Sequence, residues 1–255
     1  MRAWAPRQSC AAPPGHRLVE EVQDRLEHLT AIVDGSEVNG VRIVKDGIVS
    51  VAVVPVGQRQ VALIDAGNDS AGTAILADLA RRQLGAGAVT AIFITHGHQD
   101  HTGALPVFPG AQVFALEEEV PVVEGRAGSH GPATRFMPVR PTGVKVIRPL
   151  RDGETVTIGE TQVRVFAVPG HTAGSAAYLV NGVLVMGDAA DIAGDGKIIG
   201  SPWLFSDSQA EDRASLVRLD RRLLQEQTEV KAIACAHSGV SRKGLAPLTA
   251  FALIQ

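Results

Sequence analysis

The residues with the clearest chemical meaning lie in one short segment, residues 95–101 (THGHQDH). It holds three histidines and one aspartate within six positions, although the whole chain has only eight histidines. Imidazole and carboxylate groups are the usual protein ligands of zinc and related divalent ions. We therefore predict that His96, His98, Asp100 and His101 bind metal. A polar loop with unrelated histidines is the less favoured alternative.

The sequence around this segment explains how the four side chains would converge. Residues 91–94 (AIFI) have the apolar, β-branched character of a buried strand and run directly into the histidines. His96 and His98 are two positions apart, so an extended chain places both on the same side. Asp100 and His101 would follow on the next turn of the chain.

Three further candidates come directly after other predicted strands, where loops of a layered fold present functional residues. They are His171 in the segment PGHTAGS, Asp188 after a Gly, and His237 in the segment AHSG. Taken singly, each is modest evidence. A lone histidine after a strand is a surface or hydrogen-bonded residue as often as it is a metal ligand. A lone aspartate is an ordinary turn residue more often than it is a metal ligand. Together with the first segment they form a much stronger pattern.

The elements that must position these residues are indicated by short runs of β-branched residues and by helical periodicity. Strands are predicted at 41–44, 48–56, 61–65, 91–94, 112–115, 155–158, 162–168, 176–180, 183–187 and 230–235, with Asn181-Gly182 as a hairpin turn. Helices are predicted at 71–84, 102–107, from about Leu116, at 208–226 and at 245–254. Residues 17–29 are predicted as a short helix or an edge element. Residues 125–143 and 189–206 are predicted as irregular loops.

This order, with no internal repeat and no low-complexity linker, predicts one α+β domain over residues 16–255. Residues 1–15, rich in Ala and Pro, are predicted to be a flexible N-terminal tail. The expected architecture is two mostly antiparallel sheets packed together, with helices outside.

Composition excludes several classes of protein. The formal net charge is -3 and the chain has no basic excess, so a nucleic-acid partner is not expected. No run of apolar residues is long enough for a membrane span, and residues 1–15 lack the apolar core of a signal peptide. Cys10 and Cys235 are predicted to be unpaired thiols, which favours a cytoplasmic location.

With these residues in place, the chain resembles the metallo-β-lactamase-fold superfamily from about Val41 to Gly239. The resemblance lies in the His-x-His-x-Asp-His segment, followed in the family's order by a later His, a later Asp and a final His. It implies a four-layered αββα sandwich with a two-metal centre. His96, His98 and His171 would hold one metal, Asp100, His101 and His237 the second, and Asp188 would bridge the two.

The segment Asp65-Ala66-Gly67 is similar to an early strand-end motif of the same family. The resemblance implies that Asp65 braces the histidine loop, and a simple turn residue is the alternative. Trp203 and Phe205 lie in the second irregular loop, where they would either cover the site as a lid or pack beneath the loop.

The fold alone does not identify a substrate. Differences between this sequence and particular branches of the family reduce the number of activities to consider. Dedicated β-lactamases of this fold usually have Cys at the position of Asp188 or use no carboxylate bridge, although low-level β-lactam hydrolysis stays open. Glyoxalase II shares the seven ligands, but only 18 residues follow His237, so its C-terminal glutathione-binding domain is not expected here. An iron-dependent persulfide dioxygenase is the alternative enzyme class. A non-catalytic sensor is the third class, and the complete ligand set argues against it.

We therefore predict a metal-dependent hydrolase of the glyoxalase-II-like general type. Two divalent ions, Zn²⁺ before Fe or Mn, would activate a water to attack the carbonyl of a thioester, lactone or other small-molecule ester. Asp100 would be the catalytic residue that orients this water or takes its proton. The expected partner is a small-molecule substrate, with no nucleic acid and no membrane, and a homodimer stays open.

Overall fold

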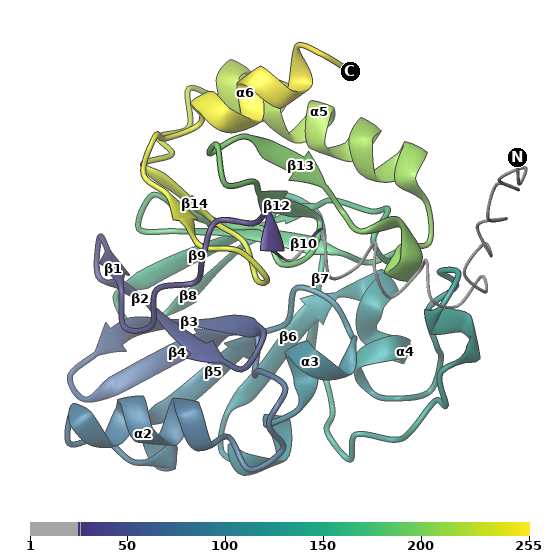
Figure 1. The fold of residues 1–255 in the computed structure, drawn as a ribbon. Coiled ribbons are helices and arrows are strands. Elements are labelled where there is room, and N and C mark those ends of the chain that lie inside the picture. The colour runs from purple at the N-terminus through teal and green to yellow at the C-terminus, as the bar shows by residue number, and fades with distance from the viewer. Residues whose placement is uncertain (1–24, 26) are drawn as a thin grey trace, which may run out of the picture.

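The computed structural model describes residue 25 and residues 27–255. The predicted tail over residues 1–15 lies outside these residues, as does most of the element predicted over 17–29. Leu29, at the end of that element, forms an isolated β-bridge with Ala193. The described chain forms two large sheets that pack face to face, with helices on the outer face of each (Figure 1).

The first sheet has seven strands in chain order, β1 to β7. Their bounds are Glu37–Val38, Val41–Asp46, Val49–Gly57, Gln60–Ile64, Val89–Phe93, Gln112–Leu116 and Arg148–Leu150. The first three pairings are antiparallel, but β4–β5, β5–β6 and β6–β7 are parallel. This sheet is therefore mixed, whereas we expected it to be mostly antiparallel. The cause is the connections, since the segments between β4, β5, β6 and β7 cross over and return the chain to the end of the sheet at which the previous strand began.

The second sheet has six strands in the order β15-β14-β11-β10-β9-β8, and only β11–β14 is parallel. The bounds of β8 to β11 are Thr155–Ile158, Thr161–Ala167, Ala176–Val180 and Val183–Val185, and those of β14 and β15 are Ala232–Ala234 and Val240–Ser241. The hairpin between β10 and β11 turns at Asn181 and Gly182, with φ angles of 51° and 77°. Positive φ at both central residues is typical of the type I′ turn that an Asn-Gly pair favours.

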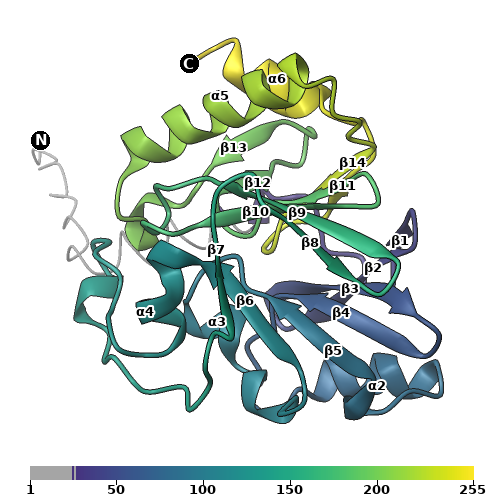
Figure 2. The ribbon, with the colours of Figure 1, turned by 180° about the vertical axis from the view of Figure 1, so that it is seen from behind.

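Helices cover the outer faces of both sheets, as Figures 1 and 2 show from opposite sides. Helix α2 (Thr73–Arg81) lies under the first sheet, and α5 (Gln209–Gln225) and α6 (Ala246–Ala252) lie over the second. The short helices α3 (Gln99–Thr102) and α4 (Val120–Val123) follow β5 and β6. None of the helices in the described part of the chain has the length and apolar character that crossing a membrane requires.

Three apolar clusters confirm the four layers predicted from the sequence. One lies between the two sheets and includes Val54 and Tyr178. A second joins the first sheet to α2 through Leu63 and Leu79, and a third joins the second sheet to α5 and α6. The alternation of side chains along each strand therefore supplies two packed faces to each sheet.

The stretch 189–206 differs from the irregular loop that we predicted. It contains a two-stranded hairpin of β12 (Ala190–Ile192) and β13 (Ile198–Gly200). Each strand has only three residues, and the intervening Gly194-Asp195-Gly196 is typical of a loop, so no periodicity revealed them. Ile192 and Ile198 are buried in the third apolar cluster, which holds the hairpin against the helices.

Candidate metal centre

The structure brings together all seven side chains that the sequence marked as metal ligands. Each follows the end of a strand: the histidine segment comes after β5, His171 after β9, Asp188 after β11 and His237 after β14. These side chains form two adjacent groups, one of three histidines and one of two histidines and two aspartates. Because the strands belong to both sheets, the groups lie where the two sheets meet.

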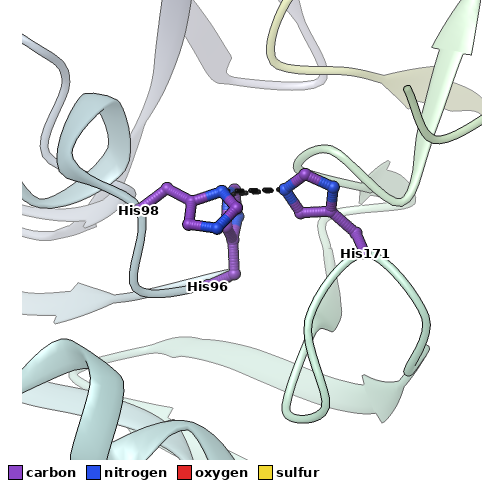
Figure 3. Close-up of side chains that lie close together, drawn as sticks. All are labelled: His96, His98 and His171. Carbon is purple, nitrogen blue, oxygen red and sulfur yellow. Dashed lines mark hydrogen bonds between the residues drawn. The ribbon is translucent and has the colours of Figure 1, made fainter. Parts of the chain in front are cut away.

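The first group consists of His96, His98 and His171, whose rings point toward one another (Figure 3). Nε2 of His96, Nδ1 of His98 and Nε2 of His171 are separated by 3.0 to 3.1 Å. In a tetrahedral zinc site with bonds of 2.0–2.1 Å, neighbouring nitrogen ligands are about 3.3 Å apart. The triangle of nitrogens therefore fits one metal ion with little adjustment.

Burial favours the neutral, ligating form of these imidazoles. It lowers the pKa of His171 to about 3 and lowers the pKa of His96 well below its usual value, with a smaller contribution from His101. The pKa of His98 is also lowered by burial. A neutral imidazole keeps one nitrogen lone pair available for a cation.

The other ring nitrogen of each histidine in this group lies beside a hydroxyl group. Nε2 of His98 is 2.9 Å from Oγ of Ser129, and Nδ1 of His171 is 3.0 Å from Oγ of Ser206. Ser206 donates its own proton to the carbonyl of Pro202 at 2.6 Å, so its oxygen is free to accept from His171. This bond fixes the tautomer in which Nε2 of His171 faces the group.

The second group consists of Asp100, His101, Asp188 and His237. Nε2 of His101 is 3.2 Å from Oδ1 of Asp188, and Nε2 of His237 is 3.1 Å from Oδ2 of the same carboxylate. Oδ2 of Asp100 lies 3.3 Å from Nε2 of His237. Nδ1 of His237 bonds the carbonyl of Ile48 at 3.0 Å, so the N–H is on that side and Nε2 faces the carboxylates.

Two buried atoms of the second group have no hydrogen bond, namely Nε2 of His101 and Oδ1 of Asp188. Nδ1 of His101 donates its proton to Oδ2 of Asp65 at 2.8 Å, which leaves a lone pair on Nε2. An unsatisfied buried polar atom is costly, and in the neutral form of His101 two electron-rich atoms face each other. A cation between them would satisfy both, so these residues fit a second metal ion.

The electrostatics of the second group also favour positive charge. The imidazole of His101 is fully buried, which alone would lower its pKa, but Asp188, Asp65 and Asp100 outweigh burial and raise the pKa well above its usual value. Burial likewise opposes ionisation of Asp188, yet His237 and His101 hold the pKa of this carboxyl well below its usual range. The group is therefore built around buried carboxylates that need a positive partner.

Asp188 lies between the two groups. Its Oδ2 is 3.6 Å from Nε2 of His171 and 3.9 Å from Nε2 of His96, in addition to its contact with His237. One carboxylate thus faces ligands of both groups, which is the position that a bridging ligand requires. The distances agree with the bridging role that the resemblance implied.

Asp65 braces the histidine loop, as the resemblance implied. Its Oδ1 accepts the backbone N–H of Thr95 at 2.7 Å, and its Oδ2 accepts the hydroxyl of Thr95 at 2.8 Å and the Nδ1 proton of His101. The residue has a φ of 64°, a left-handed conformation that Asp tolerates better than most residues. Because the Thr95 hydroxyl donates to Asp65, its oxygen can accept from Nδ1 of His96 at 3.2 Å.

Sequence reasoning missed several residues that hold the ligands in place, chiefly Ser129, Ser206 and Glu119. Glu119 is buried and accepts hydrogen bonds from Gly97, Thr172 and Gly174, next to the histidines. It lies in a run of three glutamates, which is typical of a solvated surface, so no signal distinguished it. Of the two aromatics in the loop, Trp203 is 43% exposed and neither lines the cavity beside His98.

That cavity has a volume of about 400 Å³ and extends from the histidine loop to the irregular segment at 125–143. Gly97 and His98 form one side of it, and Val122, Ser129 and Val139 lie among the residues of the other sides. It is therefore bounded both by a candidate metal ligand and by apolar side chains, as small-molecule sites commonly are.

Two sheets packed between helices, with paired His and Asp groups at the strand ends, define the class of the molecule as an αββα sandwich with a candidate dinuclear metal centre. A model of the metallo-beta-lactamase superfamily matches residues 44–237. The chain belongs to this superfamily, as the resemblance in the sequence predicted.

Similar proteins of known sequence are hydroxyacylglutathione hydrolases. The chain is 33% identical over 199 residues to the one from Nitrosomonas eutropha (strain DSM 101675 / C91 / Nm57), covering 77% of this chain and 63% of that protein. It is 34% identical to the one from Shewanella sp. (strain ANA-3), covering 45% and 40%. The chain spans about half the length of the curated relatives it matches.

Solved structures of metallo-beta-lactamases share the fold. The chain is similar to the Rm3 metallo-beta-lactamase with a TM-score of 0.64 and 19% identity, covering 92% of this chain and 94% of that one. It is also similar to BJP-1, a subclass B3 metallo-beta-lactamase of Bradyrhizobium japonicum, with a TM-score of 0.59 and 21% identity over 83% and 80% of the two chains. At this identity the likeness concerns the fold alone.

Proposed function

We propose that this protein is a metal-dependent hydrolase that cleaves a thioester, lactone or other ester of a small molecule. The observation that carries the proposal is the pair of adjacent ligand groups that share Asp188. The hydroxyacylglutathione hydrolases that the chain resembles are thioester hydrolases by name, which supports a thioester as the first substrate class to test.

In this proposal His96, His98 and His171 hold one divalent ion, Asp100, His101 and His237 hold the other, and Asp188 bridges them. Zinc is the first choice, because imidazole and carboxylate ligands suit it, and iron or manganese are the alternatives. When bound, two such ions supply Lewis-acid activation of a water and of the substrate carbonyl.

The residues of the chain contribute orientation and proton transfer. The side chain of Asp100 is 27% exposed, compared with 6% for Asp188, so it is the carboxylate of the site that an incoming water and substrate can reach. His101 and His237 lower the pKa of Asp100 against the effect of burial, which keeps it ionised. We assign Asp100 to orient the attacking water and accept its proton.

The cavity beside His98 is the proposed site for the larger portion of the substrate. Replacing Val139, which lines the cavity and is half exposed, by Trp should raise KM several-fold while kcat changes less. Ile147 is exposed too but does not line the cavity, so Ile147→Trp is the matched control. Equal effects of the two substitutions would place the substrate elsewhere.

The proposal is tested by metal analysis combined with a substrate panel. The purified protein should contain about two zinc ions per chain, following the two-metal template. It should hydrolyse at least one thioester, lactone or ester, and a chelator should abolish the turnover. A single iron per chain, with oxygen consumption on glutathione persulfide and no ester hydrolysis, would instead establish the dioxygenase alternative. Turnover confined to β-lactams would overturn the proposed substrate class.

We propose that residues 16–255 form a single domain. We also propose that the protein works in the cytoplasm on a freely diffusing substrate, a setting that suits the buried free thiol of Cys235. A homodimer is tested directly by the mass of the purified protein in solution.

A further inference from the structure

Glu119 is a buried carboxylate that the proposed metal ligands do not include. Its residue is 1% exposed, and no lysine or arginine in the described part of the chain pairs with it. Burying a carboxylate without a cationic partner is costly, so it needs several hydrogen bonds. Its neighbours Glu117 and Glu118 are exposed, so only the third residue of the acidic run faces inward.

The carboxylate of Glu119 joins two loops that are far apart in the sequence. Oε1 accepts the backbone N–H of Gly97 at 2.7 Å. Oε2 accepts the hydroxyl of Thr172 at 2.9 Å and the backbone N–H of Gly174 at 3.0 Å. Gly97 lies between His96 and His98, and Thr172 directly follows His171, so each loop carries ligands of the three-histidine group.

Glycine at two of these contacts shows how closely the loops approach the segment that carries Glu119. A Cβ atom at Gly97 would lie 2.6 Å from Cγ1 of Val122 and 2.8 Å from the backbone nitrogen of Val123. A Cβ atom at Gly174 would lie 2.4 Å from the backbone nitrogen of Glu119 itself. Only glycine permits this approach, so both loops rest on residues 119–123.

The two loops belong to different sheets, since one follows β5 of the first sheet and the other joins β9 and β10 of the second. The nitrogens of the three-histidine group must nevertheless stay 3.0 to 3.1 Å apart across this boundary. The side chain of Glu119 accepts hydrogen bonds from both histidine loops. Its Oε1 bonds the loop after β5, and its Oε2 bonds the loop between β9 and β10.

We propose that Glu119 is a positioning residue that fixes the separation of the two histidine loops and thereby sets the metal affinity of the three-histidine group. The inference rests on the metal-binding part of the proposed function. Residues that orient metal ligands typically change metal affinity about 10–100-fold when they are replaced. Glu119 acts through the loops and touches neither metal nor substrate.

The test is Zn²⁺ binding to the metal-free full chain in competition with a chromophoric chelator. His171→Ala identifies the binding phase that belongs to the three-histidine group, because it removes one of its ligands. In that phase Glu119→Gln should bind Zn²⁺ about 10–100-fold more weakly than the wild type. The amide introduced by Glu119→Gln could accept from the N–H of Gly97 through its oxygen. Its NH₂ group would then face the N–H of Gly174, and because both are donors this hydrogen bond would be lost.

Further variants separate positioning from charge and from general destabilisation. Glu119→Asp keeps the charge but is one methylene shorter, so it cannot bond both loops and should also bind weakly. Thr172→Val removes a single bond and should weaken binding less, whereas Thr172→Ser keeps the hydroxyl and should restore it. Glu118→Gln, at an exposed neighbour, is the matched control and should bind like the wild type.

The visible absorption spectrum of the Co²⁺-loaded protein adds a readout that does not depend on activity. It should change in Glu119→Gln and stay unchanged in Glu118→Gln. Wild-type Zn²⁺ affinity and Co²⁺ spectrum in both Glu119 variants would overturn the inference while leaving the hydrolase proposal intact. Absence of Zn²⁺ binding by the wild-type protein would overturn both. A wild-type phenotype in Glu119→Asp alone would assign Glu119 to charge compensation and overturn positioning.

Discussion

Nε2 of His101 and Oδ1 of Asp188 face each other at 3.2 Å in the interior of the site, and neither atom has a hydrogen bond. In the neutral imidazole, the proton of His101 is on the opposite nitrogen, where it is donated to Asp65. Two buried lone pairs at this separation repel unless positive charge lies between them. The neighbouring carboxylates raise the pKa of His101, so a proton on Nε2 supplies this positive charge in the metal-free protein, and metal binding should displace that proton.

Replacing Asp188 by Asn should remove the bridge between the two groups. An amide carries no charge and offers one oxygen, so we expect the metal content to fall from about two ions to one or fewer, with a loss of turnover of at least about 100-fold. Elemental analysis and ester hydrolysis measure the two effects. Asp195→Asn, an exposed aspartate in the β12–β13 hairpin, is the control. Unchanged metal content in Asp188→Asn would contradict the bridging assignment.

Removing the metal should lower stability, because the ion binds the folded state and the unfolded chain lacks the preformed site. At a free metal concentration of 100 times Kd, binding contributes about 2.7 kcal/mol to the free energy of unfolding. Urea unfolding of the chelator-treated and the Zn²⁺-reloaded protein measures the difference. Identical midpoints in the two states would show that the site does not bind zinc under these conditions.

The candidate metal ligands could be proposed from sequence because their spacing is local or tied to strand ends. His96 and His98 are two apart after an apolar strand, whereas His171, Asp188 and His237 are single residues after strands and were assigned through the resemblance to the family. Ser129, Ser206 and Glu119 differ, because their roles depend on which loops meet in space. A Ser in an irregular loop or a Glu in an acidic run has no periodicity that reports its partner.

In the fold, too, features set by local sequence were predicted, and features set by long-range packing were not. The Asn181-Gly182 turn and the helix over α5 follow from local chemistry, and both were predicted. The parallel pairings of β4 to β7 depend on the paths of the connecting segments over the sheet. The pairing of β12 with β13 depends on burial against α5 and α6, which a three-residue strand does not reveal.

Substitutions of Asp65 should separate folding from metal binding. Asp65→Ala leaves the Thr95 N–H and the His101 Nδ1 proton without acceptors in a buried place, which should cost about 1–3 kcal/mol or more of unfolding free energy. Asp65→Asn keeps the left-handed φ and one acceptor, so it should be the more stable variant. Its NH₂ group beside His101 would favour the tautomer protonated on Nε2, which cannot bind metal.

Both Asp65 variants should therefore lose metal from the second group, but only Asp65→Ala should lose much stability. Urea unfolding of the metal-free proteins gives the first quantity, and Zn²⁺ titration gives the second. Asp195→Asn, at an exposed position of the β12–β13 hairpin, is a suitable control. Full Zn²⁺ content in Asp65→Asn would show that the hydrogen bond to Asp65 does not determine the His101 tautomer.

Asp212 should make the stability of the protein depend on pH independently of the metal. It lies in the first turn of α5, where burial raises the pKa of its carboxyl to about 7. Oδ2 accepts the N–H of Ser201 at 3.0 Å, but Oδ1 is buried without a partner. Because the pKa is higher in the folded than in the unfolded state, the folded state holds a proton that the unfolded state has lost between about pH 4 and pH 7.

The contribution of Asp212 to stability is therefore fully present below about pH 4 and is lost as the pH rises through about 7. Asp212→Asn, which stays neutral, should become more stable than the wild type by about 2–4 kcal/mol above that pH, given about 1.4 kcal/mol for each pKa unit. The two proteins should be similar near about pH 4. Urea unfolding of metal-free wild type, Asp212→Asn and the exposed control Glu211→Gln across this range measures the effect. A constant difference between wild type and Asp212→Asn at every pH would show that this carboxyl titrates normally, because only a shifted pKa makes the difference grow with pH.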